Sequence, residues 1–513
     1  MTPNPSVATT PDVRLVPAAL TSWAVTAAGI VWSPPAAFWV AVLAVLATAV
    51  IAWRLHRAPT TFAAIWPSLV AVAAVGVAFA AAVALRVDDV HHHPIVSHYG
   101  TTATVVVVPS ESPRFLGATR MMFRGTVISL DGQRTGGRVV VFASAIDYGD
   151  VTAGRPAAFH ARISRPTRRD LSVAVLIATG RPTLGTASAV QRAAAGVRSD
   201  FAAAARAVLP ADQAAMLPAL VLGDTSALSV ETANEFRAAG LTHLTAVSGA
   251  NVTIVCGAIL LAAGLVGPRV AVASAAVALI VFVVVVQPSA SVLRAAVMGA
   301  IALFAVISRR RRQAIPALSA CVLVLVVVAP ELAVDLGFAL SVSATAALVV
   351  IAPVWSRRLV DRGWPEPLAA GVSVAVAAQL VTAPLVAGMS GTVSMMSVIA
   401  NLAVAAVIPP ITVIGTGAAA LTAAWPAAAE LMIRFIGPEL WWLSKVAHWA
   451  SSVPGAVVAV PSGWPGVVTV AIAGVAAVVL WRWRWGRVVV GVAAVCLLAW
   501  SLSGQGVNRV GMA

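Results

Sequence analysis

Long apolar runs divide the chain into segments of membrane-spanning length. A transmembrane helix needs about 20 predominantly apolar residues, and three such runs, at residues 15–32, 36–53 and 62–85, come early. A second block contains runs at residues 244–265, 270–286, 292–307, 314–328, 336–351 and 367–388, then a Pro-interrupted stretch at 394–421. Residues 430–452 are too polar to span comfortably, whereas 466–480 and 488–502 fit spanning helices. The pattern predicts a polytopic α-helical membrane protein.

Between the two blocks the apolar runs shorten, and Gly, Pro and polar residues multiply. Five runs read as strands, at residues 104–108, 122–130, 137–143, 157–163 and 171–178. The fourth alternates strictly and places His160, Arg162 and Ser164 on its polar face. Asp131-Gly132 is a turn signal between strands. Five short strands in about 100 residues suit a small inserted β-barrel such as an OB-fold.

These patterns give five successive segments. They are N-terminal transmembrane helices at 1–89, an OB-like β domain at 90–190, amphipathic surface helices at 191–240, a transmembrane domain at 241–425, and an interfacial helix with further transmembrane helices at 426–513. The segments at 54–57, 309–312 and 357–362 connect apolar runs and are rich in arginine. Under the positive-inside rule all three lie on the cytoplasmic side of the membrane. The N-terminus is then cytoplasmic and the β domain extracytoplasmic in a multi-pass plasma-membrane protein.

Composition supports the membrane class and raises the question of an anionic partner. Hydrophobic residues make up 60% of the chain and charged residues 10%, against about 25% charged in ordinary soluble domains. A larger core cannot absorb that deficit at this length, which excludes soluble enzymes, coiled coils and disordered proteins. The net charge is +15, and residues 91–200 alone carry thirteen arginines and six acidic residues. Since positive-inside disfavours basic external domains, we interpret this charge as functional; the alternative is a merely soluble basic domain.

Polar residues at the start of the second apolar block are candidates for a conduit. His243, Thr245, Ser248 and Asn251 lie where the pattern predicts a helix, and polar groups in a bilayer usually face a bundle interior or a water-filled path. On a helix Ser248 and Asn251 share a face. His243 and Ser248 would stand about 140° apart, which disfavours a Ser–His hydrolase. Lining a conduit is the preferred interpretation, and helix packing is the alternative.

Four further polar residues lie in the second block. Arg294 is either a snorkelling cation or a phosphate contact, and Asp335 lies at an external hairpin where it can pair with a basic residue. Gln379 and Asn401 are intramembrane amides, for which interhelical hydrogen bonds are the alternative role. The three histidines at 91–93 have no acidic or cysteine partner at the spacing of metal ligands. The sequence also contains no phosphate-binding loop of the Walker type. The sequence therefore predicts no metal, no cofactor and no ATP motor.

An ordered set of short motifs carries a family resemblance. They are Leu222-Gly223-Asp224, residues 236–240, residues 241–249, Arg294-Ala295, Pro330-Glu331 with residues 337–341, residues 378–380 with Pro384-Leu385, and Ala400-Asn401. Together they resemble the ComEC family of bacterial competence proteins, in the family's order and over most of the chain. The resemblance implies a non-enzymatic inner-membrane channel for single-stranded DNA in natural transformation. The alternative is a transporter or channel for a small anionic solute or a lipid-linked substrate.

The resemblance also implies site residues and partners. The DNA path would include His243, Thr245, Ser248, Asn251, Arg294, Gln379 and Asn401. External DNA contacts would come from Arg124, Arg138 and Arg162, and structural roles would fall to Asp224, Gly249, Asp335 and Gly337. Phe123, Phe142, Tyr148 and Phe159 are the aromatic candidates for base stacking. Expected partners are single-stranded DNA, the lipid bilayer, an ATP-driven cytoplasmic helicase and external DNA-receptor proteins, with a homo-oligomer left open.

Two departures from the family pattern change the expectations. The family commonly carries a second histidine after the Ser-Gly, where this chain has Asn251. Many members also end in a metallo-β-lactamase-like domain, whose metal chemistry needs a clustered His-x-His-x-Asp-His. None of the eight histidines forms that cluster. We therefore expect a form lacking that domain, without nuclease activity of its own.

Overall fold

The chain folds into two compact units, each built from separate stretches of sequence. The computed structural model describes residues 12–55, 62–111, 113–116, 119–247, 249–287, 290–307 and 313–481. The first unit, here called the barrel unit, comprises Met1–Ala195 and Gly267–Ala339, and the second, the helical unit, comprises Gly196–Val266 and Leu340–Ala513. The five successive segments expected from the sequence remain a prediction, because this division follows compactness and not the order of the chain.

Six helices of the barrel unit follow the predicted apolar runs closely. They are α1 (Val16–Val31), α2 (Pro34–Leu55), α3 (Phe62–His91), α8 (Pro268–Val286), α9 (Ala290–Ile307) and α10 (Ala314–Val328). The first three pack on one another, and α10 packs on α1 and α9. The prediction for α3 ended at residue 85, where the apolar run stops. The helix continues to His91 because polar residues also form helix, and it ends before Pro94, which cannot continue it.

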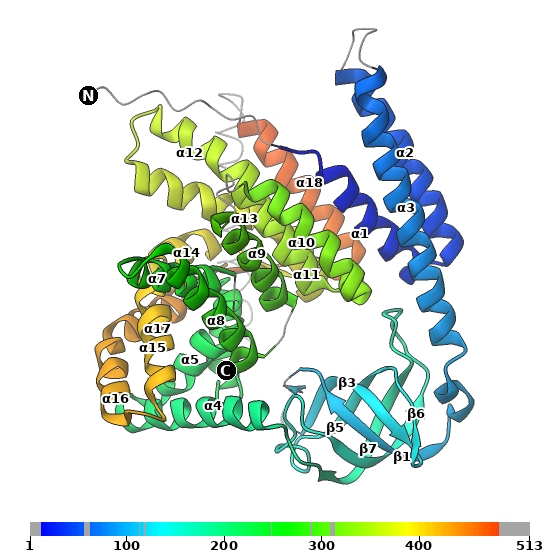
Figure 1. Cartoon of the computed structure of the whole chain (residues 1–513). Coiled ribbons are helices and arrows are strands. Elements are labelled where there is room, and N and C mark those ends of the chain that lie inside the picture. Colours follow the sequence, from blue (N-terminus) through cyan, green and yellow to red (C-terminus); the bar gives the residue numbers. More distant parts are fainter. Residues whose placement is uncertain are drawn as a thin grey trace, which may run out of the picture. The chain divides into compact units, whose positions relative to one another are not determined.

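The predicted β domain is a small barrel of five main strands (Figure 1). The strands are β1 (Thr102–Pro109), β3 (Arg120–Leu130), β5 (Arg138–Ser144), β6 (Ala157–Ser164) and β7 (Ala174–Leu184). Short strands β2 (Arg114–Phe115) and β4 (Gln133–Arg134) pair with β3. The order β1-β6-β7-β5-β3 closes through the β1–β3 pairing. Of these pairs, β5–β7 is parallel and the others are antiparallel. All five strands predicted from the sequence are confirmed.

Alternation along each strand fills the barrel with apolar side chains. In β6 Phe159 is buried while His160 and Arg162 are exposed, as the pattern predicted. Phe123 and Tyr148 are buried in the same core, and the Tyr148 and Phe159 rings meet edge to face with their centroids 5.5 Å apart. Three of the four aromatic candidates for base stacking are therefore core residues.

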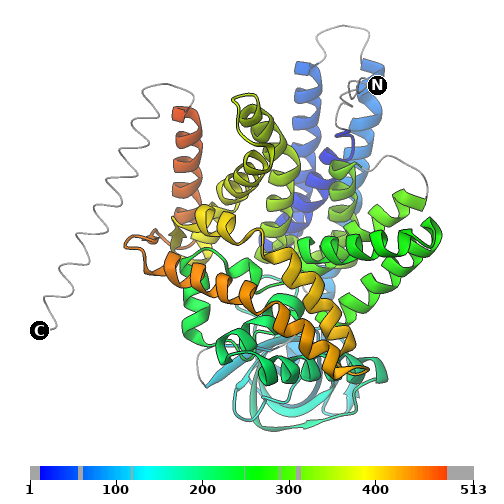
Figure 2. The ribbon, with the colours of Figure 1, turned by 90° about the vertical axis from the view of Figure 1, so that its left-hand side faces the viewer.

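The helical unit contains most of the remaining elements. They are α5 (Ala211–Leu222), α6 (Val230–Ala238), η3 (Thr242–Leu244), α7 (Gly249–Gly264), a π-helical segment (Ala347–Ile351), α12 (Ala352–Val360), α13 (Glu366–Ser390), α14 (Ser397–Val404), α15 (Ile408–Leu421), α16 (Pro426–Phe435), α17 (Gly437–Ser452), α18 (Trp464–Trp481) and the hairpin β8 (Thr392–Ser394) with β9 (Val457–Ala459). Helices α4 (Ala189–Val208) and α11 (Leu336–Ala346) run from one unit into the other. Helices α5, α7, α16 and α17 pack on α15, and α13 packs on α12, α14 and α18. In Figure 2 the yellow-to-orange helices of this unit lie beside one another.

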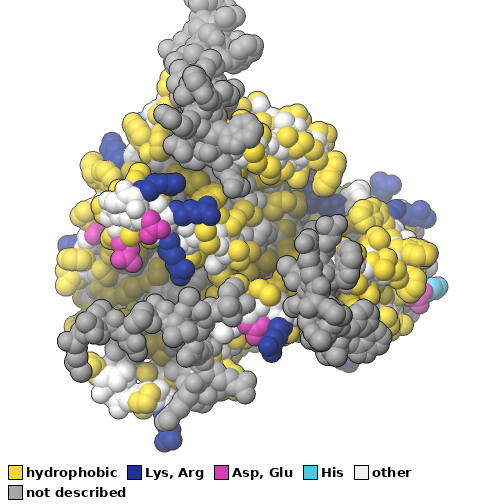
Figure 3. Space-filling view, turned by 90° about the horizontal axis from the view of Figure 1, so that it is seen from above, with side chains coloured by type: hydrophobic (Ala, Val, Ile, Leu, Met, Phe, Trp, Pro, Cys, Tyr) yellow, Lys and Arg dark blue, Asp and Glu magenta, His cyan; other side chains and the backbone are white. Residues whose placement is uncertain are grey.

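Several helices have the length and apolar character of membrane spans. Four segments qualify among the described residues: Leu69–His98, Pro268–Val286, Leu336–Val360 and Glu366–Ser390. The pair α14–α15, bent by 56°, adds a broken span or re-entrant loop where the Pro-interrupted stretch was noted. Other described apolar helices, such as α1, α7 and α10, are shorter, and the predicted span at 488–502 lies outside the described residues. Hydrophobic side chains dominate the face in Figure 3, which fits a membrane protein.

Candidate functional site

The polar segment before α7 is not the continuous helix that the sequence predicted. Residues 242–244 form a 3-10 turn, and α7 begins at Gly249. The Thr245 hydroxyl donates to the Thr242 carbonyl at 2.9 Å, a local bond that competes with helix formation. His243 and Asn251 therefore do not share one helix, and the continuous helix predicted through His243 was wrong. His243 is exposed, Thr245 is buried, and Ser248 lies outside the described residues.

The 3-10 turn at residues 242–244 follows helix α6, which is capped at both ends. Ser229 is its N-cap and accepts a hydrogen bond from the Thr232 amide at 3.0 Å. Gly240 follows the last turn with φ +73°, and the Leu241 amide donates to the Phe236 carbonyl at 2.7 Å. This is a Schellman-type ending, in which a left-handed glycine closes the helix.

Three predicted path residues donate their side-chain amides to backbone carbonyls of the helical unit. Asn401 donates to the Ser397 carbonyl at 2.8 Å and to the Gly240 carbonyl at 3.4 Å. Gln379 donates to the Ser394 carbonyl at 3.3 Å. Buried Asn251 donates to the Leu220 carbonyl at 3.0 Å, in the last turn of α5, where intrahelical donors run out. These contacts are the helix-packing role that the sequence left open, while a role in a DNA path stays a prediction.

The residues expected to be structural lie at element ends. Asp224 follows α5, and its carboxylate accepts from the amide and hydroxyl of Ser226 at 3.1 and 2.6 Å, an Asx turn. Gly249 begins α7. Asp335 precedes α11 and accepts from the Phe338 amide at 2.8 Å, while Gly337 leaves room beside that carboxylate. Asp335 and Gly249 thus lie where helices begin, Gly337 lies in the first turn of α11, and Asp224 lies in the turn after α5.

Two of the three predicted DNA-contact arginines are held by carboxylates of the barrel unit. Arg124 Nη1 lies 3.6 Å from Asp335 Oδ2 and 4.0 Å from Glu111 Oε1. Arg138 pairs with Glu331, in the 3-10 turn η4 (Pro330–Val334). Asp335 thus has the basic partner expected at its hairpin. Sequence reasoning did not pair Glu331 or Glu111 with these arginines, because no spacing rule connects them.

The electrostatics of the three arginines differ. Burial lowers the pKa of Arg138, and neighbouring Arg124 lowers it further, while Asp170, Glu111 and Asp335 oppose the shift. The guanidinium still stays charged at neutral pH. Arg162 projects from the exposed face of β6, and no ion pair to it is found among the described residues. Arg162 is thus the most accessible of the three to a phosphate.

Arg294 lies in α9 with 7% of its surface exposed. Its Nη1 lies 3.4 Å from the Met298 sulfur, and the Cys321 thiol donates to its backbone carbonyl at 3.5 Å. A snorkelling cation keeps its head in water or headgroups. Burial of Arg294 is at odds with that alternative, while the phosphate contact stays a prediction.

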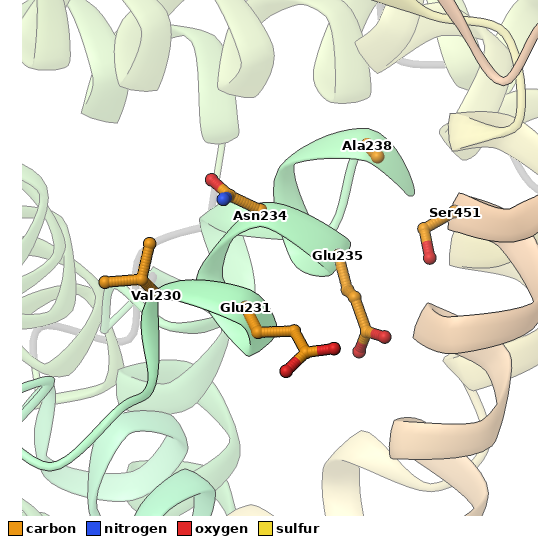
Figure 4. A pocket seen from close by; sticks show the side chains of 6 residues that line it. All are labelled: Val230, Glu231, Asn234, Glu235, Ala238 and Ser451. Atoms are coloured by element: carbon orange, nitrogen blue, oxygen red, sulfur yellow. The ribbon is translucent and has the colours of Figure 1, made fainter. Parts of the chain in front are cut away.

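A pocket of about 490 Å³ opens between α6 and α17 (Figure 4). Glu231, Asn234 and Glu235 line it from α6, and Ser451 lines it from α17. His448 Nδ1 lies 2.7 Å from Glu235 Oε1. Within the described ranges, no three His, Cys, Asp or Glu side chains gather closely enough to hold a metal ion. The acidic lining is unsuited to a phosphate.

A comparison of the sequence with known families assigns the chain to one of them. A sequence profile described as Competence protein matches residues 220–485, just over half of the chain. The chain belongs to the competence protein family. No curated protein and no solved structure matches it. The competence match contains Arg294 and the polar residues of the helical unit, whereas the barrel strands lie before it. Membership supports a role in competence.

Proposed function

We propose that this competence family protein is a plasma-membrane channel through which single-stranded DNA enters the cell. The family match carries the proposal, and the candidate membrane helices supply the spanning part. The barrel would lie outside the cytoplasm, with the N-terminus inside. A channel gives a strand no direction, so an ATP-driven cytoplasmic helicase and external DNA-receptor proteins would supply transport and delivery. The chain itself would conduct the strand without catalysis.

The barrel is proposed as an OB-like module that binds the strand. Its five strands close into a small barrel in which one pair is parallel and the others are antiparallel. OB-folds bind oligonucleotides over their second and third strands. Here these are β3 and β5, whose outer face carries Arg120 with its guanidinium 5.8 Å from the Phe142 ring centre. Phe142 is the one aromatic candidate outside the buried core. Arginine with a partly exposed ring suits phosphate contact and base stacking.

The pocket between α6 and α17 gives no support to the solute-transporter alternative. A carrier for a small anion needs a pocket with convergent cationic or amide donors. The α6–α17 pocket instead presents Glu231 and Glu235, which repel anions.

A salt series on the full-length protein tests DNA binding. Labelled single-stranded DNA should bind the detergent-solubilised protein less tightly as salt rises, because each phosphate contact adds about 0.7 to the slope of log affinity against log salt. Arg162→Ala should lower that slope by about 0.7. The matched control is Arg206→Ala, which removes an exposed arginine of α4. Salt-independent binding, or no binding at low salt, would count against the proposed function.

A further inference from the structure

Two arginines on the proposed DNA-binding face already hold negatively charged partners. Arg124 on β3 pairs with Asp335, and Arg138 on β5 pairs with Glu331, both just after α10. From these contacts we infer that Glu331 and Asp335 compete with DNA phosphates for the two arginines. A strand that binds the barrel then replaces this carboxylate pair. The inference rests on the proposed DNA-binding function and adds a regulatory contact to it.

The register of the barrel places both arginines within reach of one short strand segment. In the β3–β5 pairing Arg124 lies opposite Val140, and Thr126 lies opposite Arg138. Arg124 and Arg138 are therefore diagonal neighbours on one outer face, about 7–8 Å apart at the backbone. A backbone segment that contacts one guanidinium is thus positioned to contact the other, and each can accept a phosphate bidentately.

The exposure of the ion pairs allows the exchange. The side chains of Arg124 and Arg138 are 32% and 42% exposed, so water and ligands reach both. Water screens ion pairs whose arginines are exposed to this extent, so they hold their partners less tightly than fully buried pairs do. Replacing a carboxylate by a phosphate therefore costs little, whereas a fully buried pair would hold the arginines permanently.

The two carboxylates stay in place when the arginines change partner. Asp335 uses Oδ1 to cap the Phe338 amide, while Oδ2 faces Arg124. The loop is also tied to α1, because the Trp23 indole donates to the Ala333 carbonyl at 2.8 Å. The carboxylates therefore remain beside the arginines as fixed competitors. They weaken DNA binding at all times and prevent tight retention of the strand.

The test is DNA binding by Glu331→Gln/Asp335→Asn in the full-length protein. Both substitutions preserve shape, and Asn still caps α11. The double variant should bind labelled single-stranded DNA about threefold to tenfold more tightly at low salt. Its salt dependence should stay close to that of the wild type, because the same two arginines contact phosphates in both bound states.

The control removes two negative charges elsewhere in the same unit. Asp89 and Asp150 are exposed, so Asp89→Asn/Asp150→Asn changes net charge equally without touching the pairs. An unchanged affinity in Glu331→Gln/Asp335→Asn would overturn the competition, as would an equal gain in the control. If neither the wild type nor any variant binds DNA, the proposed function fails instead, so the two failures are distinguishable.

Discussion

Gly240→Ala is expected to destabilise the helical unit by about 2–6 kcal/mol, the sum of a backbone and a packing cost. Gly240 has φ +73°, where a residue with a Cβ costs about 1–3 kcal/mol. The added Cβ would also lie 2.5 Å from Ser397 Cβ and 3.0 Å from Ser397 Cα, and overpacking of this kind typically costs a further ~1–3 kcal/mol. Asn401 of α14 donates a hydrogen bond to the Gly240 carbonyl. Gly240→Ala would therefore also weaken the close contact between α14 and the end of α6.

Reactivity of the Cys256 thiol measures this loss. Cys256 is buried in α7 of the same unit, and in a Cys321→Ala/Cys496→Ala background its labelling during a temperature ramp reports unfolding. Gly363→Ala is the matched control, because Gly363 has φ +89° and no atom lies within 4 Å of the position that an added methyl group would take. Ser397→Gly should rescue the steric part of the Gly240→Ala defect. Equal destabilisation by Gly240→Ala and Gly363→Ala would show that the contact with Ser397 is unimportant.

The elements that sequence predicted well are those fixed by local pattern. Alternation placed Phe159 inward and Arg162 outward in β6, and Asp131-Gly132 forms the expected turn, with φ +46° and +84°. Ser229 and Gly240 bound α6 as their cap chemistry indicates. Each of these outcomes depends on a few neighbouring residues, which is the information that a single sequence contains.

The features that sequence missed depend on contacts between distant segments. Apolar content over 244–265 predicted one helix, yet the chain first makes a 3-10 turn after Gly240, and Ser397 packs closely against this glycine. Likewise, Arg138 and Glu331 are 193 residues apart, and nothing in their local sequence shows that they pair. Phe123 and Tyr148 were candidates for stacking until closure of the barrel placed them in its core.

Arg294→Ala is expected to reduce passage of single-stranded DNA by about 30-fold or more while the protein stays in the membrane. If the proposed DNA path runs past α9, a phosphate of the strand would contact the guanidinium of Arg294, which is largely shielded from water. Removing one partner of such a desolvated, hydrogen-bonded charge pair costs about 2–5 kcal/mol, and about 1.4 kcal/mol corresponds to tenfold. Proteoliposomes with equal amounts of inserted protein, assayed for entry of labelled DNA, measure the effect.

Two matched variants separate a role in conduction from a role in folding. Arg294→Lys keeps the positive charge but loses the bidentate fork, so it should retain part of the passage. Arg269→Ala removes an exposed arginine at the start of α8 and should leave passage unchanged. If Arg294→Ala lowers the amount of inserted protein as much as it lowers passage, Arg294 is structural. Full passage through Arg294→Ala would contradict the proposed phosphate contact at Arg294.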